Sequence, residues 1–308
     1  MDTFDVTNLS PMKLNGAHIP FNSSDWIYEL KLDGIRCLCH LDETSTRIYD
    51  ENQCDLLSIF PELSNLHQHV QHKCILDGEL IILKNGVSDY MQLQIRKLNR
   101  DEYRNKEIVP SYFASVVAFD ILSYEDNFLF FTPLSKRKEI LENVVEESLE
   151  LSISRYVDTY GMKLFQLAIS DRLEGVIAKR KNSFYHPGRF TSDWTEFLYR
   201  SYESKLLCGI YVDASKNRFA IIGNQKHDLL FYEGMINLCT YETAERKLIE
   251  SILSFAGQTS LCPLQIVPVF SDEVNVIWLK KLLPCSIELE HAHKSNYHHA
   301  TLRDISFS

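Results

Sequence analysis

A chain of 308 residues with 45% apolar and 24% charged residues has ordinary globular composition, and its length suggests two domains more readily than one. The formal net charge of −10 weighs against a broad nucleic-acid-binding surface, because phosphate binding needs basic groups, although a local basic groove is compatible with it. No run of about 18 apolar residues occurs, and the first twenty residues lack the features of a secretory signal, so we expect a soluble, cytoplasmic protein without membrane contact.

The first predicted strand covers residues 26–32 and ends next to a lysine. Apolar and polar residues alternate there, so that Trp26 and Tyr28 lie on one face while Glu29 and Lys31 lie on the other. Asp33-Gly34 is a turn signal and an apolar strand resumes at residues 35–41, so the two strands are predicted to form a hairpin with Lys31 just before its turn.

Further along the chain, strands and helices alternate without the regularity of βαβ units. The pattern predicts strands at residues 74–83 and 113–122, a helical or loop region at 88–109, and a helix at 133–148. Such an arrangement favours an α+β fold built on antiparallel sheets.

After Trp194 the pattern changes to short β-like runs at residues 206–212, 217–223 and 229–236. A helical stretch at about 241–256 and strands at 263–270 and 285–290 follow. Five short strands with one helix are typical of a small OB-type β-barrel. We therefore divide the chain near residues 200–205, into domains 1–203 and 204–308.

The strongest motif is the K-x-D-G-x-R run from Lys31 to Arg36, at the end of a predicted strand. It resembles the first motif of the covalent nucleotidyltransferases, the superfamily of ATP-dependent ligases and mRNA capping enzymes. Its chemistry requires an uncharged lysine amine that attacks the α-phosphate of ATP beside phosphate-binding cations. A solvated hairpin could carry the same letters, so further motifs have to decide between the two interpretations.

Three further segments resemble the later motifs of this superfamily, in the expected order: Asp77-Gly78-Glu79, Ala118-Phe119-Asp120 and Glu174 to Lys179. The resemblance implies that Glu79 approaches the ribose or a metal, that Phe119 stacks on adenine, that Glu174 holds Mg²⁺ and that Lys179 meets phosphate. Simple alternation places Glu174 and Lys179 on opposite strand faces, so one of them must lie at a bulge or at a strand mouth.

Other segments extend the resemblance to bacterial end-joining DNA ligases, with an antiparallel-sheet nucleotidyltransferase domain (ATP-grasp-like) and a trailing OB-fold. They are Pro11-Met12, Asp25-Trp26-x-Tyr28-Glu29-x-Lys31, Phe60-Pro61-Glu62-Leu63, Leu93-Gln94-x-Arg96, Pro133-Leu134 with Arg137, Tyr185-x-Pro187-Gly188-Arg189, Val276-x-Trp278 through Glu288, and Leu302-Arg303.

The resemblance implies an ATP-dependent DNA ligase whose catalytic residue Lys31 takes AMP, passes it to the 5′-phosphate of a nick and loses it to the 3′-hydroxyl. ATP would be bound by Glu29, Arg36, Glu79, Phe119 and Lys179, and Mg²⁺ by Glu79 and Glu174. Partners implied are nicked or broken DNA and an end-binding repair protein, with the ligase itself a monomer. Whether the substrate is a nick, a double-strand end or an RNA strand is left open.

Three departures from the family concern groups that handle the nucleotide. Where it has Ser-Arg-Asn-Gly, this chain has Asp50-Glu51-Asn52-Gln53, with acid in place of the arginine. Where it has Trp-Leu-Lys-x-Lys, Trp194 is followed by Thr-Glu-Phe-Leu, so Glu196 and Leu198 replace both lysines. Such a cation is typically worth about 3 to 4 kcal/mol. The sequence also ends near Arg303, just where the family continues into a basic Arg-x-Asp-Lys segment.

Two functional classes therefore stay open: an ATP-dependent DNA ligase, and a ligase-derived protein with weak or lost catalysis that binds nucleic acid or a partner. Arg200 or Lys205 would have to replace the missing lysines in the first. Two smaller clusters are also ambiguous. Basic residues at 96–106 either contact DNA or form a charged surface, and the histidines of residues 291–299 either chelate a metal or form a solvated loop.

Overall fold

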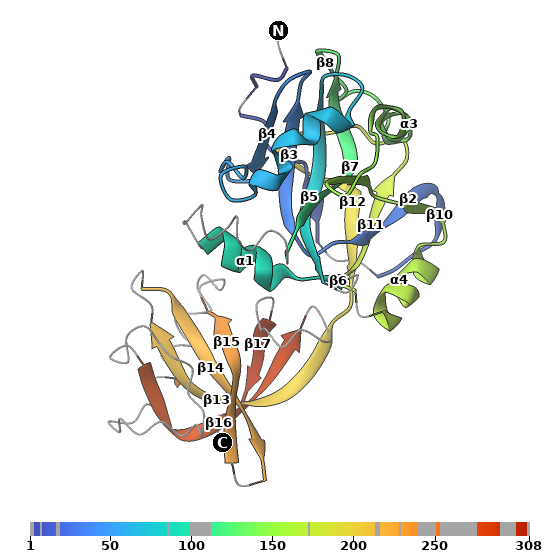
Figure 1. Ribbon diagram of the computed structural model, residues 1–308. Helices are drawn as coiled ribbons and strands as arrows, with labels where there is room; N and C mark the ends of the chain where they lie inside the picture. Colours follow the sequence, from blue (N-terminus) through green and yellow to red (C-terminus); the bar gives the residue numbers. More distant parts are fainter. Residues whose placement is uncertain are drawn as a thin grey trace. The chain divides into compact units, whose positions relative to one another are not determined.

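The computed structural model describes residues 3–306 except 7, 17–18, 85–86, 99–111, 172, 213–215, 228, 239–250, 253–275 and 290–299. The chain divides into two compact units, Met1–Leu198 and Tyr199–Ser308 (Figure 1). Both are rich in strands, and each is described by itself. Within the described residues, no helix is long and apolar enough to cross a membrane.

The first unit contains two mainly antiparallel sheets, which we call the small and the large sheet. The small sheet has the strand order β1-β12-β11-β2-β10: Lys13–Asn15, Phe190–Leu198, Gly175–Arg180, Ser23–Lys31 and Tyr156–Thr159. The large sheet has the order β4-β3-β5-β7-β8: Thr46–Asp50, Ile35–Leu41, Cys74–Lys84, Ala114–Tyr124 and Asn127–Phe128. Two short strands complete it, β6 (Val87–Ser88) on β5 and β9 (Leu151–Ile153) on β7.

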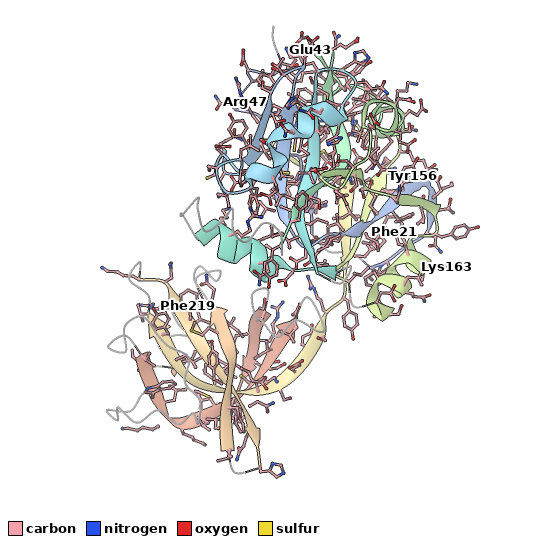
Figure 2. All side chains as sticks on the ribbon, viewed as in Figure 1. Phe21, Glu43, Arg47, Tyr156, Lys163 and Phe219 are labelled. Carbon is pink, nitrogen blue, oxygen red and sulfur yellow. The ribbon has the colours of Figure 1, made fainter. Side chains whose placement is uncertain are left out.

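Helices pack against both sheets. A 3-10 helix η1 (Pro61–His69), helix α1 (Tyr90–Leu98) and helix α3 (Leu134–Val144) pack against the large sheet. Helix α4 (Gly161–Ser170) packs against the small sheet through the apolar face that contains Trp26 and Tyr28. Phe21, labelled in Figure 2, adds edge-on ring contacts to Trp26 and Phe197 in the same cluster.

A third apolar cluster joins the inner faces of the two sheets and so positions the candidate site. Ile27 and Trp194 enter it from the small sheet, and Leu38, Ile75 and Phe119 enter it from the large sheet. All five side chains are buried. The outward Trp26 and Tyr28 and the inward Ile27 confirm the alternation predicted for the strand at residues 26–32.

The predicted hairpin between residues 26–32 and 35–41 is wrong. Both strands exist, but β2 belongs to the small sheet and β3 to the large sheet, so the Asp33-Gly34 connection carries the chain from one sheet to the other. A Cβ atom at Gly34 would lie 2.4 Å from the Leu80 carbonyl oxygen, which explains why glycine occupies this crossing.

The other predictions for this unit hold with changed boundaries. The strands at residues 74–83 and 113–122 are confirmed as β5 and β7, and helix is present at residues 90–98. The helix predicted at 133–148 ends at Val144, because Val145 turns to an extended conformation and pairs with Val70.

The second unit is an antiparallel sheet with the order β15-β14-β13-β16-β17: Leu229–Asn237, Arg218–Lys226, Ser201–Val212, Val276–Leu289 and Ala300–Ile305. The runs at 206–212, 217–223 and 229–236 are confirmed. The last predicted strand begins at residue 276 rather than 285, and β17 was not predicted. The strand at 263–270 and most of the helix at 241–256 fall outside the described residues. Among those described, β15 and β17 are edge strands, so the predicted OB barrel is not shown as closed.

His40 provides a test of this packing. Its ring is buried on β3, Nδ1 lies 3.2 Å from the Phe4 carbonyl oxygen, and burial lowers its pKa to about 4. An unfolded histidine titrates near 6.5, so the folded state binds fewer protons and the free energy of unfolding should fall as pH drops from about 6.5 toward 4.

We predict that up to ~3 kcal/mol of stability is lost over this pH range through His40. Denaturant unfolding of the wild type and of His40→Gln at several pH values measures it as the difference between the two curves, because glutamine does not titrate. Parallel curves from pH 7 to 4 would contradict the prediction.

Candidate active site

A pocket of about 490 Å³, including its open mouth, lies between the facing sheets. Six residues predicted from the sequence to bind nucleotide or AMP line it: Glu29, Lys31, Arg36, Glu79, Phe119 and Lys179. They come from β2, β3, β5, β7 and β11, so strand topology gathers residues that are up to 150 positions apart. The predicted metal ligand Glu174 contacts Lys31.

Strand register explains why these side chains face the pocket. Lys31 on β2 is opposite Gly175 on β11, which is opposite Leu198 on β12. Glu29, Ile177 and Glu196 form the next such row. Directly opposed residues of antiparallel strands share a sheet face, so both rows point to the side where Lys31 and Glu29 line the pocket.

The amine of Lys31 is held at the pocket rim by an ion pair. Its Nζ lies 2.9 Å from Glu174 Oε2, and its side chain is 25% exposed. Glu174 lies just before Gly175, the first residue of β11. It is therefore outside the strand, and the alternation that would place Glu174 and Lys179 on opposite faces does not apply to it. Gly175 has φ of +151°, and a Cβ atom there would lie 2.1 Å from the Phe197 carbonyl oxygen. The close strand packing beside Lys31 therefore requires glycine.

The carboxylates around Lys31 keep it charged. Burial lowers the pKa of Lys31, but Glu174, followed by Glu196 and Glu79, outweighs burial and raises that pKa above its usual value. A lysine attacks phosphorus only as the neutral amine, so Glu174 must be withdrawn or must accept the proton before Lys31 can react.

Arg36 is fixed at the pocket by a second ion pair. Its guanidinium makes two hydrogen bonds to Asp77, with lengths of 2.6 and 2.7 Å, and lies 4.5 Å from the centre of the Phe119 ring. Asp77 also accepts a hydrogen bond from the Tyr185 hydroxyl, which in turn accepts one from the Met12 backbone amide. Arg36 is thus presented with fixed geometry.

Glu29 binds two lysines rather than facing the pocket as a free carboxylate. One of its oxygens is 2.9 Å from Lys179 Nζ, and the other pairs with Lys138 of α3. All three side chains are buried. Burial raises the pKa of Glu29, but the two lysines outweigh it and the pKa is lowered. The sequence suggested that the Glu29 side chain contacts ATP. In the structure, both of its carboxylate oxygens contact lysines.

Lys179 lies against two aromatic rings. Its Nζ is 4.2 Å from the Phe119 ring centre and 4.3 Å from that of Trp194, and burial lowers its pKa to about 8. Lys138, Trp194 and Ser154 were not proposed as site residues from the sequence. The sequence could have indicated that Lys138 is buried, because it lies four residues after Leu134 and three before Leu141, on the apolar face of the helix.

The two predicted metal ligands suit a divalent cation in their chemistry. Burial, and then the carboxylates of Glu174 and Asp77, raise the pKa of Glu79 to about 7 against the effect of Arg36 and Lys31. A cation near Glu79 and Glu174 would relieve this repulsion. No group of three or more metal-ligating side chains is found among the described residues, so phosphate and water oxygens would have to complete the coordination shell, as is usual for Mg²⁺.

Comparison with known proteins identifies the family. The profile described as ATP dependent DNA ligase domain matches residues 12–197. The chain belongs to this family.

Two relatives illustrate how far the similarity of this ligase domain extends. The SPbeta prophage-derived DNA ligase-like protein LigB of Bacillus subtilis is 27% identical over 202 residues, which are 65% of this chain and 71% of LigB. LigD of Mycobacterium tuberculosis, a multifunctional non-homologous end joining DNA repair protein, is 30% identical over 196 residues, 63% of this chain. The chain spans only 24% of LigD's length.

A solved structure shows the same fold. The structure of mycobacterial DNA ligase D complexed with ATP and MES is 22% identical, and the match covers 98% of this chain and 96% of that one with a TM-score of 0.58. The family match over residues 12–197 confirms the resemblance to ATP-dependent DNA ligases inferred from the sequence motifs.

The residues that depart from the family pattern lie on the pocket face of β12 and around a second hollow of the first unit. Glu196 and Leu198, which stand where the family has lysines, both lie on the pocket face of β12. At the other departure Gln53 stands where the family has glycine and keeps a left-handed conformation, with φ of 63°. Its side-chain amide donates a 2.9 Å hydrogen bond to the Leu9 carbonyl oxygen. Glu51 and Arg36 both line the second hollow of the ligase domain.

The cations that could replace the missing lysines are engaged elsewhere in the second unit. Arg200 pairs with Glu288 at 3.2 Å, and Lys205 pairs with Glu203 and Glu233. Likewise, Arg96 of the basic run is completely buried and binds Glu62. The rest of that run beyond residue 98, and the histidines of residues 291–299, lie outside the described residues.

The buried group of Glu29 and two lysines yields a stability prediction. Glu29→Gln should cost about 3–5 kcal/mol, because it leaves the two buried ammonium groups without their counter-charge. The double variant Glu29→Gln/Lys138→Met should recover part of this loss, because one uncompensated charge is removed. Denaturant unfolding of the two single variants and the double variant tests the coupling. Additive losses would show that Glu29 and Lys138 do not interact.

Proposed function

We propose that this ligase domain seals breaks in DNA through an AMP-lysine intermediate on Lys31, using ATP and Mg²⁺. The observation that carries the proposal is the placement of the Lys31 amine at the rim of a pocket that also contains the Phe119 ring and two further cations, Arg36 and Lys179. Family membership supports a DNA ligase activity, and the mycobacterial ligase D of the same fold was solved with ATP.

In the proposed first step, the AMP part of ATP occupies the pocket with its adenine near Phe119, and the Lys31 amine attacks the α-phosphorus. As the N–P bond forms, the bond from the α-phosphorus to the bridging oxygen breaks and pyrophosphate leaves. Glu174, 2.9 Å away, is the nearest acceptor for the proton that Lys31 must lose. Arg36 and Lys179 place positive charge near the α-phosphate that is transferred. Glu79 and Glu174 would hold Mg²⁺, which supplies further neutralisation of phosphate charge when bound.

We further propose that the first unit, close to the predicted domain 1–203, is the adenylation domain, and that the second is an OB-fold that serves DNA sealing. The five-stranded antiparallel sheet of the second unit supports the OB-fold assignment. Nicked DNA is the expected partner of a monomeric enzyme.

The alternative, a ligase-derived protein with weak or lost catalysis, is favoured by the acidic and apolar residues Glu51, Glu196 and Leu198. Two of them lie on the pocket face of the small sheet, where a triphosphate would need positive charge. The two functions differ in whether Lys31 acquires AMP.

Incubation with saturating ATP and Mg²⁺ is therefore predicted to add one AMP to the intact protein, and Lys31→Ala should abolish the gain. Lys31→Arg is the matched control, because it keeps a cation beside Glu174 but is a far poorer nucleophile. Mass spectra should be taken from neutral solution, since phosphoramidates hydrolyse in acid.

Failure of the folded wild type to gain AMP would contradict the first step and favour the binding protein. An adduct that persists in both variants would place it on another residue.

A further inference from the structure

Glu196 introduces negative charge beside the pocket, close enough to Lys31 to act on its amine. It is half-buried on β12, opposite Ile177, which is opposite Glu29, and both of these neighbours line the pocket. Its charge acts on Lys31 together with those of Glu174 and Glu79. Trp194, two residues earlier on the same face of β12, also lines the pocket, so Glu196 continues the wall toward Lys31.

The positive charges of the pocket already have partners. Of its described lining residues, three are cations, and each pairs with a carboxylate: Lys31 with Glu174, Arg36 with Asp77, and Lys179 with Glu29. Leu198 adds no charge in the row of Lys31. The pocket wall near Glu196 therefore offers little positive charge to balance a ligand that carries many negative charges.

The possible AMP donors differ in that charge. ATP carries a triphosphate with an ionised terminal group, whereas AMP joined to a DNA 5′-phosphate is a pyrophosphate diester with fewer charges. Repulsion by a nearby carboxylate grows with the charge it faces, and the partly buried site screens it less than water does. Glu196 thus penalises ATP more than an adenylylated DNA end.

We infer that Glu196 determines donor specificity: it slows adenylyl transfer from ATP while leaving the pocket competent for a 5′-adenylylated DNA end. This inference rests on the proposed function. For the favoured substrate, the 3′-hydroxyl attacks the 5′-phosphorus of the DNA, a phosphodiester forms, AMP leaves, and the hydroxyl proton passes to solvent.

The test compares two reactions of the full chain under single-turnover conditions. The first is AMP transfer from ATP to Lys31, with Mg²⁺. The second is sealing of a pre-adenylylated nick with Mg²⁺ and without ATP. The variants are Glu196→Gln, which keeps the shape and removes the charge, and Glu196→Lys, which reverses it. Asp193→Asn is the matched control, because it removes one negative charge from the same strand on the opposite face, where Asp193 pairs with Arg180.

We expect Glu196→Gln to speed AMP transfer from ATP roughly tenfold, and Glu196→Lys by more, with less than about a twofold change in sealing of the pre-adenylylated nick. Asp193→Asn should change neither rate. Thermal unfolding of each variant shows whether it is folded. If Glu196→Lys does not fold, the near-isosteric Glu196→Gln still decides the test.

Equal effects of Glu196→Gln on both reactions, or a slower transfer from ATP, would overturn the inference. A slower transfer with a higher Mg²⁺ requirement would show instead that Glu196 recruits the cation. Such results leave the proposed function intact as long as Lys31 is adenylylated. If no variant forms the Lys31 adduct or seals the pre-adenylylated nick, the proposed function fails and the inference fails with it.

Discussion

The candidate site depends on a buried carboxylate that joins the small sheet to helix α3 in the first unit. Glu29 lies on β2 of the small sheet, Lys179 on β11 beside it, and Lys138 on α3, which packs against the large sheet. Removing one buried partner from such a group leaves an uncompensated charge, whose cost exceeds that of most apolar contacts. The spacing of helix α3 from the small sheet, and with it the pocket wall near Phe119, is therefore fixed by charge as well as by apolar packing.

This anchoring is what allows Lys31 to lie at a rim rather than in a core. β2 ends at Lys31, and the chain then crosses to the other sheet through Gly34, which no larger residue could replace without displacing β5. Gly175 lets β12 approach β11 beside the same lysine. Lys31, the proposed nucleophile, thus has backbone fixed on both sides and a side chain with one close ion pair, an arrangement that combines precise placement with access to a ligand.

The sequence specified the motif residues well and their spatial relation poorly. Strand alternation correctly placed Glu29 and Lys31 together, and strand positions such as 74–83 were readable because each alternates or is continuously apolar. The hairpin error arose because Asp33-Gly34 has turn chemistry in either context, and local pattern cannot tell a turn from a crossing between sheets. The residues that contact the motif residues were harder still to predict from the sequence. Lys138 belongs to no motif, and its pairing with Glu29 joins residues far apart in the chain.

The retained motif residues also need a second explanation besides catalysis. Glu29, Arg36, Asp77 and Lys179 each take part in a buried or partly buried ion pair, so loss of any one would destabilise the fold whether or not the protein reacts with ATP. Positions 196 and 198, where the family resemblance implies lysines, lie on the pocket face, where a cation acts mainly on a ligand. Glutamate and leucine at these positions are therefore expected to affect ligand binding more than the stability of the fold.

Lys31 does not fit that structural explanation as easily. Its side chain is one-quarter exposed, although that of its partner Glu174 is buried. Unlike the fully buried Lys179, Lys31 can therefore reach a ligand in a pocket with an aromatic wall, beside Glu79 and Glu174. The position of this lysine at an open pocket supports the proposed AMP transfer more strongly than the number of motif residues does.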